Sequence, residues 1–214
     1  MDSDSRSTIR RVVRACRTAA ALLVLLAGVL PATPAAQTAQ DEGAVSAALP
    51  EGVGGRRDSH TVFLQGGLAD DTDMLVVGIT WDWPWHRDYA LGRLSGYWEM
   101  SFGRWDTNHP ALDGSTWVTQ FGVTPVLRLQ PESWGGRWFI EAGIGANLLL
   151  PVYRSSDKRF STTFNFGDHL AVGRRFGQRA EHEIALRLQH FSNAGIKRPN
   201  PGEDFIQLRY SRRF

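Results

Sequence analysis

Eight stretches of this chain alternate between apolar and polar residues with a period of two. They lie near residues 60–69, 73–83, 90–105, 115–129, 137–149, 161–176, 180–192 and 204–214. This period is typical of β-strands that turn one face to an apolar environment and the other to a polar one. Turn residues separate the stretches, and no convincing amphipathic helix interrupts them. We therefore expect an all-β fold built from eight antiparallel strands.

The alternation is clearest in residues 137–149. One face carries the apolar set Trp138, Ile140, Ala142, Ile144, Ala146 and Leu148, and the other carries Arg137, Glu141, Gly143, Gly145 and Asn147. The polar faces of the eight stretches contain charges that need partners if the sheet closes on itself. We expect Glu99, Glu141 and Glu183 to pair with arginines inside a filled barrel. The expected arginine partners are Arg93, Arg137, Arg187 and Arg209.

Three features favour a membrane barrel over a soluble sandwich. The stretches are about as long as membrane-spanning strands. Tryptophans gather near their ends and suit interfacial girdles, namely Trp81, Trp83, Trp85, Trp105, Trp134 and Trp138. The last stretch ends at Phe214, and an aromatic-ended amphipathic strand resembles the assembly signal of bacterial outer-membrane barrels. We expect an eight-stranded antiparallel transmembrane β-barrel in the outer membrane.

The N-terminal part has a different composition. Residues 1–35 combine several arginines with a short apolar core, from Ala19 to Leu30, and then small residues, which predicts a secretory signal peptide cleaved after Ala35. The only cysteine, Cys16, lies inside this segment. Residues 36–58 are rich in Ala, Gln, Gly and acids and read as a flexible lead-in. The barrel is expected over residues 59–214.

Few binding functions are indicated elsewhere. The formal net charge is only +2 and is carried partly by the signal segment, so nothing favours nucleic acid as a partner. The histidines show no trusted metal-ligand spacing, and no phosphate-binding glycine loop is present. We expect neither a metal nor a cofactor.

A His and a Ser near the C-terminus lie where neither is structurally expected. His190 and Ser192 are two residues apart, so they share a strand face. That face is the one that carries Leu188, which is the lipid side, where polar groups point to function. With an even number of strands, the connection at about 193–203 is extracellular. We therefore expect a site that faces the outer leaflet.

A serine nucleophile needs a base and an orienting acid. His190 is the candidate base and Ser192 the candidate nucleophile. Two acids compete: Asp204 has the lipid-facing phase of His190, whereas Glu203 has the lumen phase, unless a bulge turns it outward. For the oxyanion, the available donors are Asn193 and Asn200, or backbone N–H groups around Gly195 and Gly202.

The stretch from His190 to Gly202 resembles the signature of the PagL-type lipid A 3-O-deacylases of Gram-negative outer membranes. Further blocks resemble the family in the same order, namely Thr80–Trp83, Gly92–Trp98 and Phe139–Gly145. The resemblance covers most of residues 60–214. It implies an eight-stranded barrel with a membrane-facing Ser-His-Glu triad that removes the 3-position acyl chain of lipid A without a metal.

Carried over residue by residue, the resemblance makes His190 the base and Ser192 the nucleophile, and places Asn193 and Asn200 in the oxyanion region. The family glutamate falls on Asp204 by gapless counting, while the glutamate of this chain, Glu203, is one residue early. We expect Asp204 to be the acid, with lower activity because its side chain is shorter than that of Glu.

The implied partners are lipid A, or lipopolysaccharide, and the outer membrane, and a homodimer stays open. Two rival functions also stay open: an outer-membrane phospholipase, and a non-catalytic barrel that anchors or adheres. The sequence gives neither the acyl-chain preference nor whether the activity is latent in the native membrane.

Overall fold

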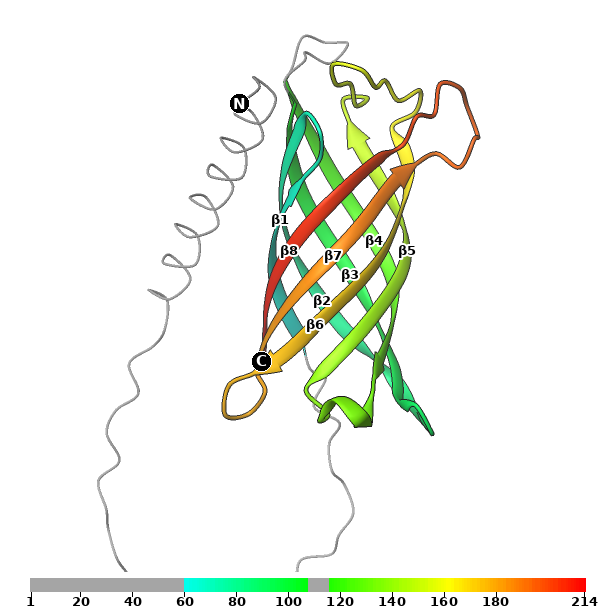
Figure 1. Cartoon of the computed structure of the whole chain (residues 1–214). Coiled ribbons are helices and arrows are strands. Elements are labelled where there is room, and N and C mark those ends of the chain that lie inside the picture. The colour runs from blue at the N-terminus through cyan, green and yellow to red at the C-terminus, as the bar shows by residue number, and fades with distance from the viewer. Residues whose placement is uncertain (1–59, 108–115) are drawn as a thin grey trace, which may run out of the picture. The chain divides into compact units, whose positions relative to one another are not determined.

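The computed structural model describes residues 60–107 and 116–214. Within them, eight strands form a closed barrel in which each strand pairs antiparallel with its neighbours and β8 pairs with β1 (Figure 1). The strands are β1 (His60–Leu68), β2 (Thr72–Tyr89), β3 (Gly92–Thr107), β4 (Trp117–Gln130), β5 (Trp138–Leu150), β6 (Phe164–Phe176), β7 (His182–Ser192) and β8 (Glu203–Arg213). The 3₁₀-helix η1 (Glu132–Trp134) joins β4 to β5.

The predicted eight strands and their antiparallel order are confirmed, and the main differences are at strand ends. The stretch expected to end at residue 83 continues to Tyr89 as β2. Its pairing with β3 shifts register between Asp82 and His86 and then resumes. Pro84 lies in this interval and has no N–H to donate to a ladder, so a local irregularity is expected there. None of the helices among the described residues is long and apolar enough to cross a membrane.

The alternation of the sequence becomes an inside and an outside. In β5 every second side chain, from Phe139 to Leu149, is buried, and those between are exposed. In β7 the exposed set is Ile184, Leu186 and Leu188, as the pattern predicts. The outer wall is therefore apolar and the lumen holds polar side chains, which is the arrangement of a membrane barrel.

Two clusters of ion pairs fill the middle of the lumen. Glu99 accepts hydrogen bonds from Arg187, at 3.0 Å to Oε2, and from Arg209, at 2.6 Å to Oε2. Arg128 lies between Glu141, at 2.6 Å, and Glu183, which it contacts through two parallel bonds of 2.7 and 2.8 Å. Carboxylate–arginine bonds of this kind are charge-assisted and stronger than neutral ones, although the buried Nε of Arg187 has no partner among the described residues.

The predicted lumen position is wrong for two of the four arginines. Arg93 lies outside, where it pairs with the exposed Asp88 at 2.8 Å, and Arg137 is exposed and contacts the Gly177 carbonyl oxygen. Both lie at strand ends, where the strict alternation breaks. The places that they were expected to fill are taken by Arg128 and by Arg175, which donates to Glu183 at 2.9 Å.

Trp105 is a second correction, because it is fully buried rather than part of an interfacial girdle. Its Nε1 donates to Gln120 Oε1 at 2.8 Å. Trp105 has the phase of the lumen-facing Glu99, and this decides its direction although it lies near the end of β3. Trp85, Trp134 and Trp138 are exposed, in agreement with the expected positions.

The two ends of the barrel differ. Figure 1 shows η1 and the β6–β7 turn at the end where β8 finishes, and the β5–β6 and β7–β8 connections at the opposite end. These connections are residues 151–163 and 193–202, and Gly202 of the second one lies against His190. The expected signal peptide (1–35) and lead-in (36–58) lie outside the described residues.

Candidate active site

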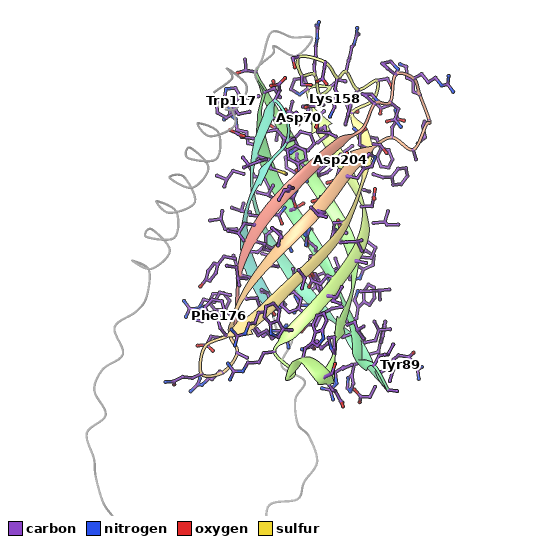
Figure 2. The ribbon with its side chains drawn as sticks, in the orientation of Figure 1. Asp70, Tyr89, Trp117, Lys158, Phe176 and Asp204 are labelled. Atoms are coloured by element: carbon purple, nitrogen blue, oxygen red, sulfur yellow. The ribbon has the colours of Figure 1, made fainter. Side chains whose placement is uncertain are left out.

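His190 and Asp204 face each other across the last two strands. They are register partners in the β7–β8 ladder, and His190 Nδ1 lies 2.7 Å from Asp204 Oδ1. An ionised carboxylate can only accept hydrogen bonds, so Nδ1 carries the proton in this contact. Nε2 of the neutral ring is then the nitrogen with a free lone pair. Figure 2 places Asp204 at the end of the barrel that carries the long connections.

Glu203 points the other way, into the lumen. It is buried, and its Oε2 accepts a hydrogen bond from the Tyr153 hydroxyl at 2.6 Å while its Oε1 accepts one from Lys158 Nζ at 2.9 Å. Adjacent residues of a strand project to opposite faces, so no bulge turns Glu203 outward. Strand phase therefore predicts correctly which acid lies beside His190, and the short Asp204 side chain reaches it.

The contacts of Glu203 form a cap that ties the β5–β6 connection to the start of β8. Burial, and then the hydrogen bond to Glu203, raise the pKa of the Tyr153 hydroxyl, so this group stays protonated and donates. Partial burial works to lower the pKa of Lys158, but its hydrogen bond to Glu203 and the charge of that carboxylate outweigh this and raise it. Both Glu203 oxygens are thus occupied within this cap.

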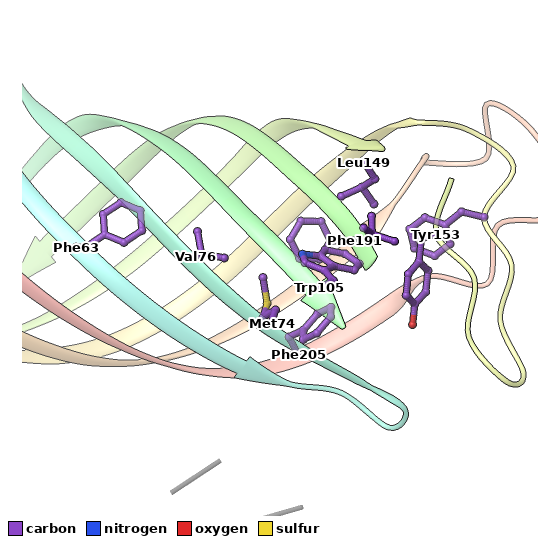
Figure 3. Close-up of a cluster of buried hydrophobic side chains, with 10 residues drawn as sticks. Phe63, Met74, Val76, Trp105, Leu149, Tyr153, Phe191 and Phe205 are labelled. Atoms are coloured by element: carbon purple, nitrogen blue, oxygen red, sulfur yellow. The ribbon is translucent and has the colours of Figure 1, made fainter. Parts of the chain in front are cut away.

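Ser192 ends β7 on the same face as His190. Its Oγ accepts a weak hydrogen bond from the Ala194 N–H at 3.5 Å. The residue between the two, Phe191, points inward and is fully buried, and Phe205 does the same next to Asp204. Both rings pack edge-on against Trp105, with centroids 4.8 Å away (Figure 3). This aromatic cluster fixes the two strands directly behind the candidate site.

Gly202 makes room for the imidazole. Its φ of +73° is in the left-handed region that favours glycine, and a β-carbon there would lie 2.5 Å from His190 Cε1. Sequence reasoning named Gly202 only as a backbone donor and missed this packing role. The proximity of a glycine to His190 across the loop is non-local, so no local pattern announces it.

Asn193 and Asn200 hold the shape of the loop that follows Ser192. The Asn193 amide group Nδ2 has three acceptors within reach, Ser161 Oγ at 3.1 Å, Thr162 Oγ1 at 3.2 Å and the Lys197 carbonyl oxygen at 2.8 Å. Asn200 Oδ1 accepts the backbone N–H of Asn193 at 2.9 Å. The expected use of the Asn193 side chain as an oxyanion donor does not fit, because its amide hydrogens are engaged inside the loop.

Apart from Ser192 and Asp204, the described wall around His190 is apolar with one exception. Leu188 and Ile206 are more than half exposed beside it, and Leu170 is exposed on β6. The exception is Asp168, the register partner of His190 on β6, which is exposed and which the sequence reasoning missed. Its phase, shared with Leu170, was the available signal. Polar groups on an apolar wall can contact the polar part of an amphiphilic molecule while the wall contacts its apolar chain.

Comparisons with known proteins agree on one family. The model of the family described as lipid A 3-O-deacylase (PagL) matches residues 74–213. The chain is 35% identical over 156 residues to the lipid A deacylase PagL of Bordetella bronchiseptica, which covers 72% of this chain and 83% of that protein. It is 30% identical over 136 residues to the lipid A deacylase PagL of Pseudomonas aeruginosa, over 63% of this chain and 74% of that protein. The crystal structure of the outer membrane enzyme PagL superposes with a TM-score of 0.60 at 27% identity, over 71% of this chain and 97% of that one.

Proposed function

The chain belongs to the lipid A 3-O-deacylase (PagL) family, and we propose that it hydrolyses the ester that links an acyl chain to the 3-position of lipid A. The observation that carries this proposal is the His190–Asp204 contact on the outer wall, with Ser192 on the same face. A hydrolase of this kind needs its catalytic groups where the acyl chains lie, which is beside the barrel and not inside it.

The proposed mechanism assigns one role to each group. Ser192 Oγ attacks the ester carbonyl while His190 Nε2 accepts its proton, and Asp204 stabilises the imidazolium that forms. The tetrahedral intermediate collapses to an acyl-Ser192 ester, and His190 gives the proton to the departing sugar hydroxyl. Water, activated by the same histidine, then hydrolyses the acyl-enzyme and releases the free fatty acid.

The oxyanion requires donors near Ser192. Since the Asn193 side chain and the backbone N–H groups of Asn193 and Gly195 are engaged in the loop, we assign this role to the Ala194 N–H, to other backbone N–H groups of the loop that are not bonded within it, and to the Asn200 amide nitrogen. The Ala194 N–H is adjacent, because it already points at Ser192 Oγ from 3.5 Å. Such donors contribute several kcal/mol when they are preorganised, about 2.7–4 each in a hydrolase.

We also propose that the site faces the outer leaflet. Because the number of strands is even, the start of β1 and the end of β8 lie at the same end of the barrel. Asp204, the register partner of His190, lies at the opposite end (Figure 2). In an outer membrane the chain termini of such barrels are periplasmic, so the opposite end is extracellular. Lipopolysaccharide resides in that leaflet.

The experiment is mass spectrometry of lipid A from cells that express the full chain. The wild type should release one 3-linked acyl chain, and the variants Ser192→Ala and His190→Ala should each leave lipid A intact, because nucleophile and base fail as a unit. Ser95→Ala is the matched control. Ser95 lies near the start of β3, at the end of the barrel opposite to the site, and this variant should be fully active. Full activity of either variant would contradict the proposed roles of Ser192 as nucleophile and His190 as base. Release of fatty acid from glycerophospholipids instead would favour the phospholipase.

A further inference from the structure

A cavity lies between the two long connections at the same end of the barrel as His190. Its volume is about 870 Å³. Arg159 lines it from residues 151–163, and Gly195, Arg198 and Asn200 line it from residues 193–202. Two segments far apart in the sequence thus each bring one arginine to one cavity.

The two guanidinium groups are available. Arg159 and Arg198 are both exposed, and neither forms an ion pair with any residue in the described ranges 60–107 and 116–214. The one acid in the lining, Asp157, accepts a hydrogen bond from Ser155 Oγ at 3.1 Å. The adjacent Lys158 differs, because it is bound to Glu203. The cavity therefore has an excess of positive charge.

The cavity shares its wall with the loop that follows Ser192. Asn200 lines it and accepts the backbone N–H of Asn193, the residue after Ser192. Gly195, also in the lining, donates its N–H to Asn193 Oδ1 at 3.0 Å. Gly195 follows Ser192 by three positions, which limits their Cα atoms to about 10 Å apart. A ligand in the cavity would lie within one sugar unit or so of the serine.

We propose that this cavity is a phosphate subsite that holds a phosphomonoester of the acylated glucosamine substrate while its ester lies at Ser192. The inference rests on the proposed function and extends it to the recognition of the head group. Arginine suits the task because its planar fork binds phosphate oxygens through two parallel hydrogen bonds. Lipid A is a phosphorylated glucosamine disaccharide, so phosphate and ester are close on one rigid scaffold.

The test compares substrates and variants in detergent micelles, with the full-length protein. The substrates are phosphorylated lipid A and the same lipid after phosphatase treatment. The double variant Arg159→Gln/Arg198→Gln removes both guanidinium groups, and Arg179→Gln/Arg174→Gln removes the same charge from the opposite end of the barrel. Each charge-assisted contact is worth roughly a tenfold change or more, so wild-type kcat/KM should fall at least about tenfold when the phosphates are removed.

The double variant should lose this discrimination. On dephosphorylated lipid A, the double variant and the wild type should have the same kcat/KM. On phosphorylated lipid A, the kcat/KM of the double variant should fall to about that same value. Arg179→Gln/Arg174→Gln should keep the wild-type ratio. An unchanged ratio in the double variant, or equal losses on both substrates, would overturn the subsite.

Competition by inorganic phosphate tests whether the cavity binds the phosphate of the lipid or free phosphate. We expect millimolar inorganic phosphate to raise the KM of the wild type weakly and to leave the double variant unaffected, because the lipid gains binding from its chains as well. Inhibition of equal strength in both proteins would contradict the proposal.

The proposed function can fail separately. If no form of the protein deacylates lipid A, binding of phosphorylated and dephosphorylated lipid A to the Ser192→Ala protein still tests the cavity. Preferential binding of the phosphorylated lipid, lost when Arg159 and Arg198 are also replaced, would support the subsite without the reaction. Equal binding of both lipids would overturn it.

Discussion

The lumen and the outer wall use the same kinds of side chain in opposite ways. In the lumen, Glu99 and its two arginines are buried and bonded to one another, so their charges are closed to outside partners. On the wall, the His190–Asp204 pair is accessible, and no hydrogen bond from residues 60–107 or 116–214 engages His190 Nε2. The first arrangement stabilises a fold, whereas the second can carry out a proton transfer. In β8 the two arrangements meet at adjacent residues, because Glu203 points into the interior and Asp204 lies on the wall.

The strongest test of this comparison is to neutralise each of the two acids in turn. Asp204→Asn should lower kcat on lipid A by up to about 10⁴-fold, as loss of the orienting carboxylate does in serine hydrolases. Glu203→Gln should cost far less, because Glu203 contacts only the cap. Turnover of both variants, at matched amounts of folded barrel, measures the difference.

The reverse result, an inactive Glu203→Gln with an active Asp204→Asn, would mean that the lumen acid reaches the site. Two mild variants would mean that another group orients His190, and Asp168 would then be the first residue to replace. Asp204→Glu provides the conservative control and should retain activity.

The lumen side of the comparison predicts a loss of stability without a loss of chemistry. Glu99→Gln leaves Arg187 and Arg209 buried without their carboxylate, and removal of one partner from a buried pair typically costs about 3–5 kcal/mol. Unfolding in urea, followed by the heat-dependent gel shift of the barrel, should report this. The exposed Glu132→Gln in η1 should unfold like the wild type. If Glu99→Gln unfolds at the same urea concentration as the wild type, the Glu99 carboxylate does not stabilise the barrel as predicted.

A smaller effect is expected where the two regions meet. Tyr153→Phe removes the hydrogen bond to Glu203, worth about 0.5–1.5 kcal/mol, and loosens the start of β8 next to Asp204. We expect a modest fall in kcat with little change in KM. Thr163→Val, on the same connection but outside the cap, is the comparison variant. A KM effect alone would point to substrate contact instead.

The smallest effect is a dependence on alkaline pH. The raised pKa of Lys158 means that its pairing with Glu203 contributes full stability below the ordinary lysine value of 10.5 and loses it as the pH rises through the higher folded value. The wild-type barrel should therefore lose a little stability in that range, and Lys158→Met should not. Melting temperatures at pH 8 and pH 11 test this, and parallel losses in both proteins would contradict it.

Local periodicity was sufficient for the strands and for the placement of Asp204 beside His190, because the direction of a side chain in a strand depends only on its count from its neighbours. It failed for Arg93 and Arg137, where alternation breaks at strand ends. It also failed for Asn193, whose partners Ser161 and Thr162 are about thirty residues away in sequence. Contacts between loops depend on the closed barrel, which no local pattern contains.

His190 lies on an apolar wall next to the exposed register partners Leu188 and Ile206, and for the proposed reaction this position determines how turnover is measured. A lipid reaches such a site by diffusion in the plane of its leaflet, so the relevant concentration is a mole fraction at the surface and not a molarity. Diluting the substrate with inert detergent at constant bulk amount should therefore slow turnover. An inhibitor of this enzyme would have to partition into the bilayer before it could compete.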